Sequence, residues 1–164
     1  MTTAMASAVA TPIAMIFATN DILVLRALDG LTPQQLWEAP TDRNNAMLWI
    51  AGHLVQTRAQ LLGVLGESFD TGWGDRFNRG AVVGAADGYP PREQIEQVMG
   101  DVSQRLQAKL AALSDVQLAQ PPAAAIAGAK TIADQVALFA FHDSYHVGQM
   151  AFIRKALGFP ALAG

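Results

Sequence analysis

The sequence contains no cysteine among its 164 residues. This absence excludes a disulfide framework, a thiolate metal ligand and a thiol nucleophile supplied by the protein itself. Charged residues are also scarce, at 15% of the chain, whereas typical soluble proteins have roughly 25%. The 11 lysines and arginines are scattered and the net charge is −3, which argues against a nucleic-acid partner.

Long hydrophobic runs are missing as well. No uninterrupted stretch of about 18 apolar residues occurs, so no membrane span is expected. The apolar N-terminal segment lacks the basic residues of a signal peptide and continues through Asn20 and Asp21 into a helical pattern. We therefore expect a cytoplasmic protein. Because hydrophobic residues make up 51% of a weakly charged chain, we also expect part of its surface to be buried in a homodimer.

The length fits one domain spanning residues 1–164, and the hydrophobic pattern predicts four long helices and no strand. The first helix begins at Thr11-Pro12, a capping hydroxyl followed by proline, and ends at Gly30. Thr32 begins one short helical turn. The other long helices are predicted over residues 45–66, 91–113 and 131–157. This pattern indicates an all-α protein with the architecture of a four-helix bundle.

The segment between the second and third predicted helices, residues 66–90, is rich in glycine and has no regular period. Structureless segments longer than about 12–15 residues are uncommon unless they perform a task or cross the fold. This one is long enough to cross the height of a bundle, so the two helices that it joins can run parallel. We expect Trp73, Arg76 and Phe77 to line the mouth of a substrate pocket. The alternative is that the aromatic residues only pin the loop to the bundle.

The chain has only three histidines, and all of them lie in the middle of predicted helices. His142 and His146 are four residues apart, which places them on one helix face. His53 lies on an apolar stripe of another helix. An unpaired imidazole is costly to bury there, so we predict that the three histidines bind one divalent metal ion and leave positions open for water or substrate. The alternative is that they are hydrogen-bonded core residues, because an HxxxH pattern alone is common by chance.

Other polar residues accompany the histidines of the last helix. We expect Gln149, Asp143 and Tyr145 to lie beside the ligands, although Asp143 could equally be solvated and Tyr145 could be a packing residue. The segment HDSYH superficially matches the HExxH pattern of zinc proteases, with Asp143 in the position of the glutamate base. We reject that interpretation because no histidine, aspartate or glutamate follows His146 to act as the third ligand. His53 is the histidine that remains.

Two motifs surround the histidines. One is W-x-x-G-H-L, formed by Trp49, Gly52, His53 and Leu54, and the other is H-x-x-x-H-x-G-Q, formed by His142, His146, Gly148 and Gln149. With these motifs the chain resembles, over nearly its whole length, the DinB-like (YfiT-like) superfamily of four-helix-bundle metalloenzymes. The resemblance implies an up-down-down-up bundle and a Zn, Ni, Fe or Mn ion on the three histidines. It also implies a homodimer.

The resemblance implies more than one activity. Characterised relatives are S-transferases and isomerases that use low-molecular-weight thiols such as bacillithiol, mycothiol or glutathione, and others are metal-dependent hydrolases. The metal would lower the pKa of a bound thiol or of bound water, so neither reaction needs a nucleophile from the protein. Our first hypothesis is a thiol-dependent S-transferase that acts on small electrophiles with a thiol cosubstrate. The alternatives are a metal-dependent hydrolase and a non-catalytic bundle that binds a metal or a ligand.

Overall fold

A computed structural model describes residues 7–41, 44–80 and 88–162 of the chain. Within these residues all regular structure is helical and no strand occurs, as the sequence predicts. Four helices are long and two are short. The long helices are α1 (Ala10–Leu28), α3 (Met47–Val64), α4 (Arg92–Ala112) and α6 (Ile132–Ala156), and the short ones are α2 (Pro33–Trp37) and α5 (Asp115–Leu118).

The helix starts show how far local capping signals determine the boundaries. Thr131 begins α6 with a capping box, and Thr32 does the same for α2. Ser114 forms a third capping box and begins α5, which the sequence analysis missed because the following prolines and alanines suggested a plain connection. The predicted cap of the first helix is wrong. Thr11 lies inside α1, where its hydroxyl donates to the carbonyl of Ser7.

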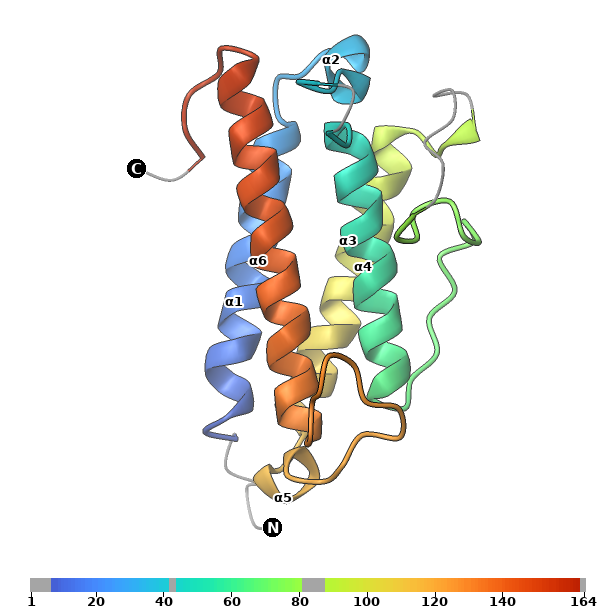
Figure 1. Ribbon diagram of the computed structural model, residues 1–164, viewed down its shortest axis with the longest axis vertical. Helices are drawn as coiled ribbons and strands as arrows, with labels where there is room; N and C mark the ends of the chain where they lie inside the picture. The colour runs from blue at the N-terminus through green and yellow to red at the C-terminus, as the bar shows by residue number, and fades with distance from the viewer. Residues whose placement is uncertain (1–6, 42–43, 81–87, 163–164) are drawn as a thin grey trace.

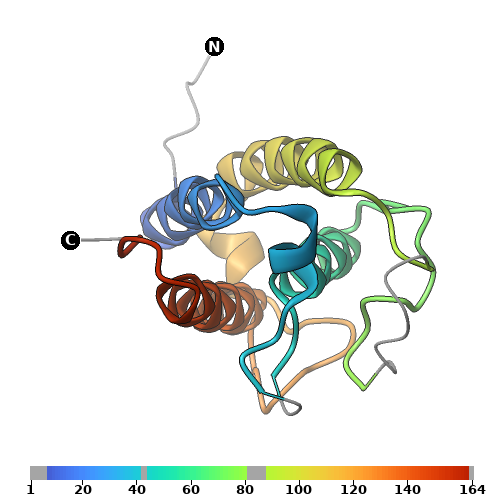
Figure 2. The ribbon, with the colours of Figure 1, turned by 90° about the horizontal axis from the view of Figure 1, so that it is seen from above.

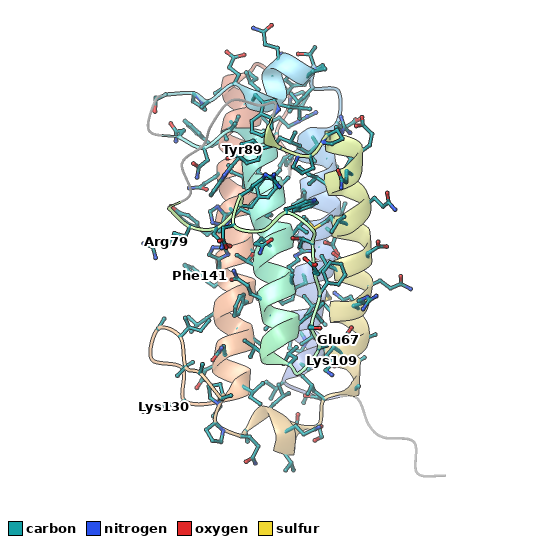
Figure 3. All side chains as sticks on the ribbon, turned by 90° about the vertical axis from the view of Figure 1, so that its right-hand side faces the viewer. Glu67, Arg79, Tyr89, Lys109, Lys130 and Phe141 are labelled. Carbon is teal, nitrogen blue, oxygen red and sulfur yellow. The ribbon has the colours of Figure 1, made fainter. Side chains whose placement is uncertain are left out.

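The four long helices run up, down, down and up (Figure 1), which confirms the predicted topology. Seen from above (Figure 2), the four long helices form a ring. In this ring α1 lies between α4 and α6, and α3 lies between the same two helices on the other side. Because α3 and α4 are parallel, the loop after α3 climbs the full height of the bundle. Figure 3 shows this ascent, with Glu67 low and Tyr89 high. Residues 81–87 of that loop lie outside the described part of the chain.

The core is densest around α3, in which most side chains are buried. By contrast, α1 and α6 keep large apolar side chains on their outer faces, among them Met15, Ile22, Phe141 and Phe152. By length and hydropathy α1 is the one described helix that could cross a membrane, a test that core helices of soluble proteins also pass. Asn20 and Asp21 of α1 form polar contacts with residues of other helices, so we interpret α1 as a helix of the bundle. The homodimer stays a prediction, because a single chain does not test it.

A buried arginine joins all four long helices. Arg58 of α3, with 1% of its surface exposed, donates from Nε and Nη2 to the two carboxylate oxygens of Asp143 on α6, each over 2.9 Å. Its Nη1 donates to Ser103 of α4 over 2.6 Å and pairs with Asp21 of α1. From α1, the Asn20 amide also donates to Asp143 over 2.9 Å. Each of the other three long helices therefore supplies at least one polar partner to the central guanidinium of α3.

The charge of Arg58 persists because of these partners. Burial lowers the pKa of Arg58, but the charges and hydrogen bonds of Asp143 and then of Asp21 outweigh burial and raise the pKa above its usual value. A buried charge that keeps its partners is tolerated, whereas one that loses them destabilises the fold. The network therefore fixes how the four helices are rotated relative to one another.

Replacing Arg58 with alanine should lower the free energy of unfolding by about 3–5 kcal/mol, because Asp143 would be left buried without its partner. Urea denaturation near neutral pH measures this change. The matched control is Arg105→Ala, which removes an exposed arginine that contacts Glu67 over 3.4 Å. That substitution should cost no more than about 1 kcal/mol. Equal losses in the two variants would contradict the role given to the network.

Candidate metal centre

The three histidines converge between two antiparallel neighbours, α3 and α6. The Nε2 atom of His142 lies 3.2 Å from Nε2 of His53 and 3.1 Å from Nε2 of His146. The potential ligand atoms of the three residues all lie within 4.8 Å of one another. The i,i+4 spacing aligns the two histidines on α6, and the packing of α3 against α6 brings His53 opposite them. The three side chains therefore meet at one point between α3 and α6.

Two of the imidazoles are held in the tautomer that leaves Nε2 free to bind a metal ion. Nδ1 of His53 donates to the backbone carbonyl of Phe77 over 2.6 Å, and Nδ1 of His146 donates to Oε1 of Gln149 over 2.7 Å. In a neutral imidazole, a proton on Nδ1 leaves a lone pair on Nε2. Acceptors of this kind orient histidine ligands and raise their basicity in known metal sites. The two Nε2 lone pairs are therefore directed toward the shared centre.

Packing also holds the ring of His53 in place. The indole of Trp49 stacks on it with ring centroids 5.0 Å apart and planes 11° apart. The ring of Phe77 lies directly against Gly52, where an added Cβ would overlap the ring carbons. Gly52 is therefore required because it lets Phe77 approach α3 closely enough for its carbonyl to accept the proton of His53. This contact explains the glycine before the histidine in the W-x-x-G-H-L motif.

The pKa values of all three histidines are lowered, which favours neutral imidazoles near pH 7. Burial lowers the pKa of His53, although the hydrogen bond to Phe77 partly opposes it, and burial is also the main cause of the lowered pKa of His146. Burial, followed by the charges of His146 and His53, lowers the pKa of His142 to about 4, and Arg79 contributes to this shift. Neutral imidazoles are the form that binds metal ions, so no proton has to leave before binding at neutral pH.

These features fit a divalent metal ion. Two nitrogen ligands at roughly 2.0–2.1 Å from zinc in tetrahedral geometry lie about 3.3 Å apart, close to the 3.1 and 3.2 Å between the Nε2 atoms. Within the described residues no carboxylate or further histidine joins the cluster. The group therefore offers three neutral ligands, as catalytic zinc sites with an open position do.

A cavity of about 470 Å³ lies beside the histidines, and His53 and His142 form part of its wall. Its other walls are apolar side chains near the start of α6 and polar side chains from α3 and the climbing loop. They come from Thr57, Gln60, Asn78, Arg79, Ile126, Ala127, Leu138, Phe139, Phe141 and Tyr145. A volume of this size suits a small organic molecule.

The three residues predicted to lie beside the ligands have different positions. Gln149 bonds to His146 as expected. Tyr145 lines the cavity, and its ring meets the ring of His146 edge-on with centroids 5.4 Å apart. Asp143 is neither solvated nor in contact with a histidine, because it faces the core and pairs with Arg58. No pattern near Asp143 pointed to this pairing, since Arg58 is 85 residues away in the sequence.

The expected pocket residues of the climbing loop need correction. Trp73 and Phe77 are buried against each other and against the bundle. They therefore pin the loop to the bundle, which was the alternative interpretation, and do not line the cavity. Arg76 is exposed and donates to the carbonyl of Trp73. The loop residues that line the cavity are instead Asn78 and Arg79, which follow directly after the anchoring ring of Phe77.

The fold and the histidine cluster define a helical bundle with a three-histidine metal-binding arrangement. The chain belongs to the DinB superfamily, whose family model matches residues 20–150. The chain is similar to the solved structure of YfiT from Bacillus subtilis, with a TM-score of 0.66 and 15% identity over 92% of this chain and 89% of that one. YfiT is described as a probable metal-dependent hydrolase with an unusual four-helix bundle topology. A comparison with curated proteins finds no match.

Gly52→Ala should displace the ring of Phe77 and with it the carbonyl that orients His53. We expect the free energy of unfolding to fall by about 1–3 kcal/mol and the metal affinity to fall about 10–100-fold. The control is Gly63→Ala on the same helix, where an added Cβ meets no atom within 4 Å. It should stabilise the protein by roughly 0.5–1 kcal/mol. The role of Gly52 would be refuted if its variant matched the control in urea denaturation and metal titration.

The lowered histidine pKa values predict how the stability of metal-free protein depends on pH. The pKa of His142 is about 4 when folded and about 6.5 when unfolded. Between these values the unfolded chain binds more protons, so the free energy of unfolding decreases as the pH falls from about 6.5 to about 4. Urea denaturation at about pH 7.5 and about pH 5 should show this loss. The loss should be smaller in His142→Gln, and an unchanged loss would contradict the assignment.

Proposed function

We propose that this protein is a metal-dependent hydrolase of small organic substrates, with one divalent ion held by His53, His142 and His146. The observation that carries this proposal is the convergence of three Nε2 atoms beside a cavity whose wall includes His53 and His142. The description of YfiT as a probable metal-dependent hydrolase supports the choice of reaction. When bound, such an ion would act as a Lewis acid and make a small nucleophile or a polarised carbonyl reactive near neutral pH.

The residues of the chain would then have three tasks. Phe77 and Gln149 hold the protons of His53 and His146 on Nδ1, so that both Nε2 atoms stay available. Apolar side chains on the cavity wall bind the nonpolar part of a substrate and exclude water from it. Tyr145 and Thr57 bring hydroxyl groups to the lining, and these can bond to polar atoms of the substrate.

A second candidate is the thiol-dependent S-transferase, which one observation favours. Among the described residues that line the cavity there is no aspartate or glutamate, two residues that often act as general bases. A thiol needs no such base, because a metal ion alone can stabilise its thiolate form. The apolar wall of the cavity would hold the electrophile for such a thiol.

Metal analysis of protein purified without a histidine tag tests the site. We expect one divalent ion per chain, and His146→Ala should lose this ion while helical circular dichroism is retained. Gln149→Ala should weaken metal binding only about 10–100-fold, because it removes a partner of a ligand rather than a ligand. A full complement of metal in His146→Ala would refute the ligand assignment.

Assays of the metal-loaded protein separate the reactions. A hydrolase should cleave activated esters or amides without added thiol, and His53→Ala should abolish this activity. Conjugation of a haloaromatic to a small thiol, without hydrolysis, would replace the hydrolase with the S-transferase. If neither activity exceeds that of free metal in solution, the protein is a non-catalytic metal-binding bundle.

A further inference from the structure

Arg79 is the only lysine or arginine among the described residues that line the cavity beside the histidines. It lies on the climbing loop two residues after Phe77, whose carbonyl holds His53. Figure 3 shows Arg79 on the same edge of the bundle as Phe141 of α6. Arg79 and Phe141 thus bring a cation from the loop and an apolar ring from α6 to one cavity.

The guanidinium of Arg79 has no acidic partner within the described part of the chain. Three of the other described arginines have such a partner. Arg58, Arg92 and Arg105 pair with carboxylates, and Arg76 donates to a backbone carbonyl. Arg79 therefore leaves a positive charge uncompensated beside an apolar wall.

The cavity has two chemically distinct parts. Ile126, Leu138, Phe139 and Phe141 form a wall that suits a nonpolar group. Arg79 offers parallel N–H donors that match the two oxygens of one carboxylate. A single cation suits a monoanion better than a phosphate dianion, which is usually bound by several positive donors. No carboxylate of the described lining would repel such a ligand.

We propose that Arg79 selects substrates that carry a carboxylate on a nonpolar body, with the carboxylate at the loop and the nonpolar part against α6. This inference rests on the proposed hydrolase function, but the selection of carboxylates is itself a property of binding and does not require turnover. Arg79 is then a specificity residue, and the reacting bond of the substrate lies between its carboxylate and the histidines.

Calorimetry on zinc-loaded protein tests the selection without turnover. The ligands are 4-phenylbutyrate and its uncharged amide, which share one nonpolar body. We expect the carboxylate to bind more tightly, and Arg79→Gln should weaken its binding about tenfold while leaving the amide unchanged. Arg79→Lys should restore part of the loss, because it keeps the charge but not the paired donors. The control Arg76→Gln, on the same loop but outside the cavity lining, should change neither affinity.

The same variants are then compared in turnover of the 4-nitrophenyl monoester of adipic acid and of 4-nitrophenyl hexanoate. Arg79→Gln should raise KM for the charged ester about tenfold with little change in kcat, and should leave the hexanoate ester unaffected. If neither ester is cleaved but the calorimetric preference depends on Arg79, the hydrolase proposal fails and the ligand selection stands. The selection is overturned if the wild type shows no preference, if Arg79→Gln keeps the preference, or if it weakens both ligands equally.

Discussion

The bidentate pair between Arg58 and Asp143 sets the rotation of α6 against α3, and the histidine cluster depends on that rotation. Successive residues of an α-helix are about 100° apart around its axis. Asp143 can therefore face the buried guanidinium while its neighbour His142 faces the cavity. Turning α6 by one residue would separate Asp143 from Arg58 and leave buried charges without partners. The same turn would separate the imidazoles. Because buried charges tolerate few arrangements, the ion pair excludes such alternatives more strictly than apolar packing does.

The bundle thus divides its polar residues between two sides of α3 and α6. Charged groups that compensate one another, Arg58 and Asp143, occupy the interior, and neutral imidazoles occupy the wall of the cavity. A metal ion held by neutral ligands would keep its full positive charge, and Arg79 adds a second positive charge nearby. The cavity is therefore suited to electron-rich ligands, whereas the interior of the bundle is electrically balanced.

The helices and the histidine cluster could be predicted because their signals are local. Capping residues, hydrophobic periodicity and the four-residue spacing of His142 and His146 all lie within single helices. The Arg58 network could not be predicted, because an arginine within a helix looks solvated until its partners on other helices are known. The cavity residues of the loop were misplaced for a related reason. Aromatic rings such as Phe77 can cover a pocket or anchor a loop, and only the packing against Gly52 decides between the two.

The sequence distance between the ligands has a consequence during protein synthesis. His53 and His142 are 89 residues apart, and α6 is the last of the four long helices. A ribosome therefore makes three of these helices before either ligand on α6 exists, and the nascent chain offers only one imidazole to a passing ion. The complete triad appears only once α6 can dock beside α3. Metal uptake would thus be tied to closure of the bundle, and the free energy of binding would stabilise the finished fold rather than a partly made chain.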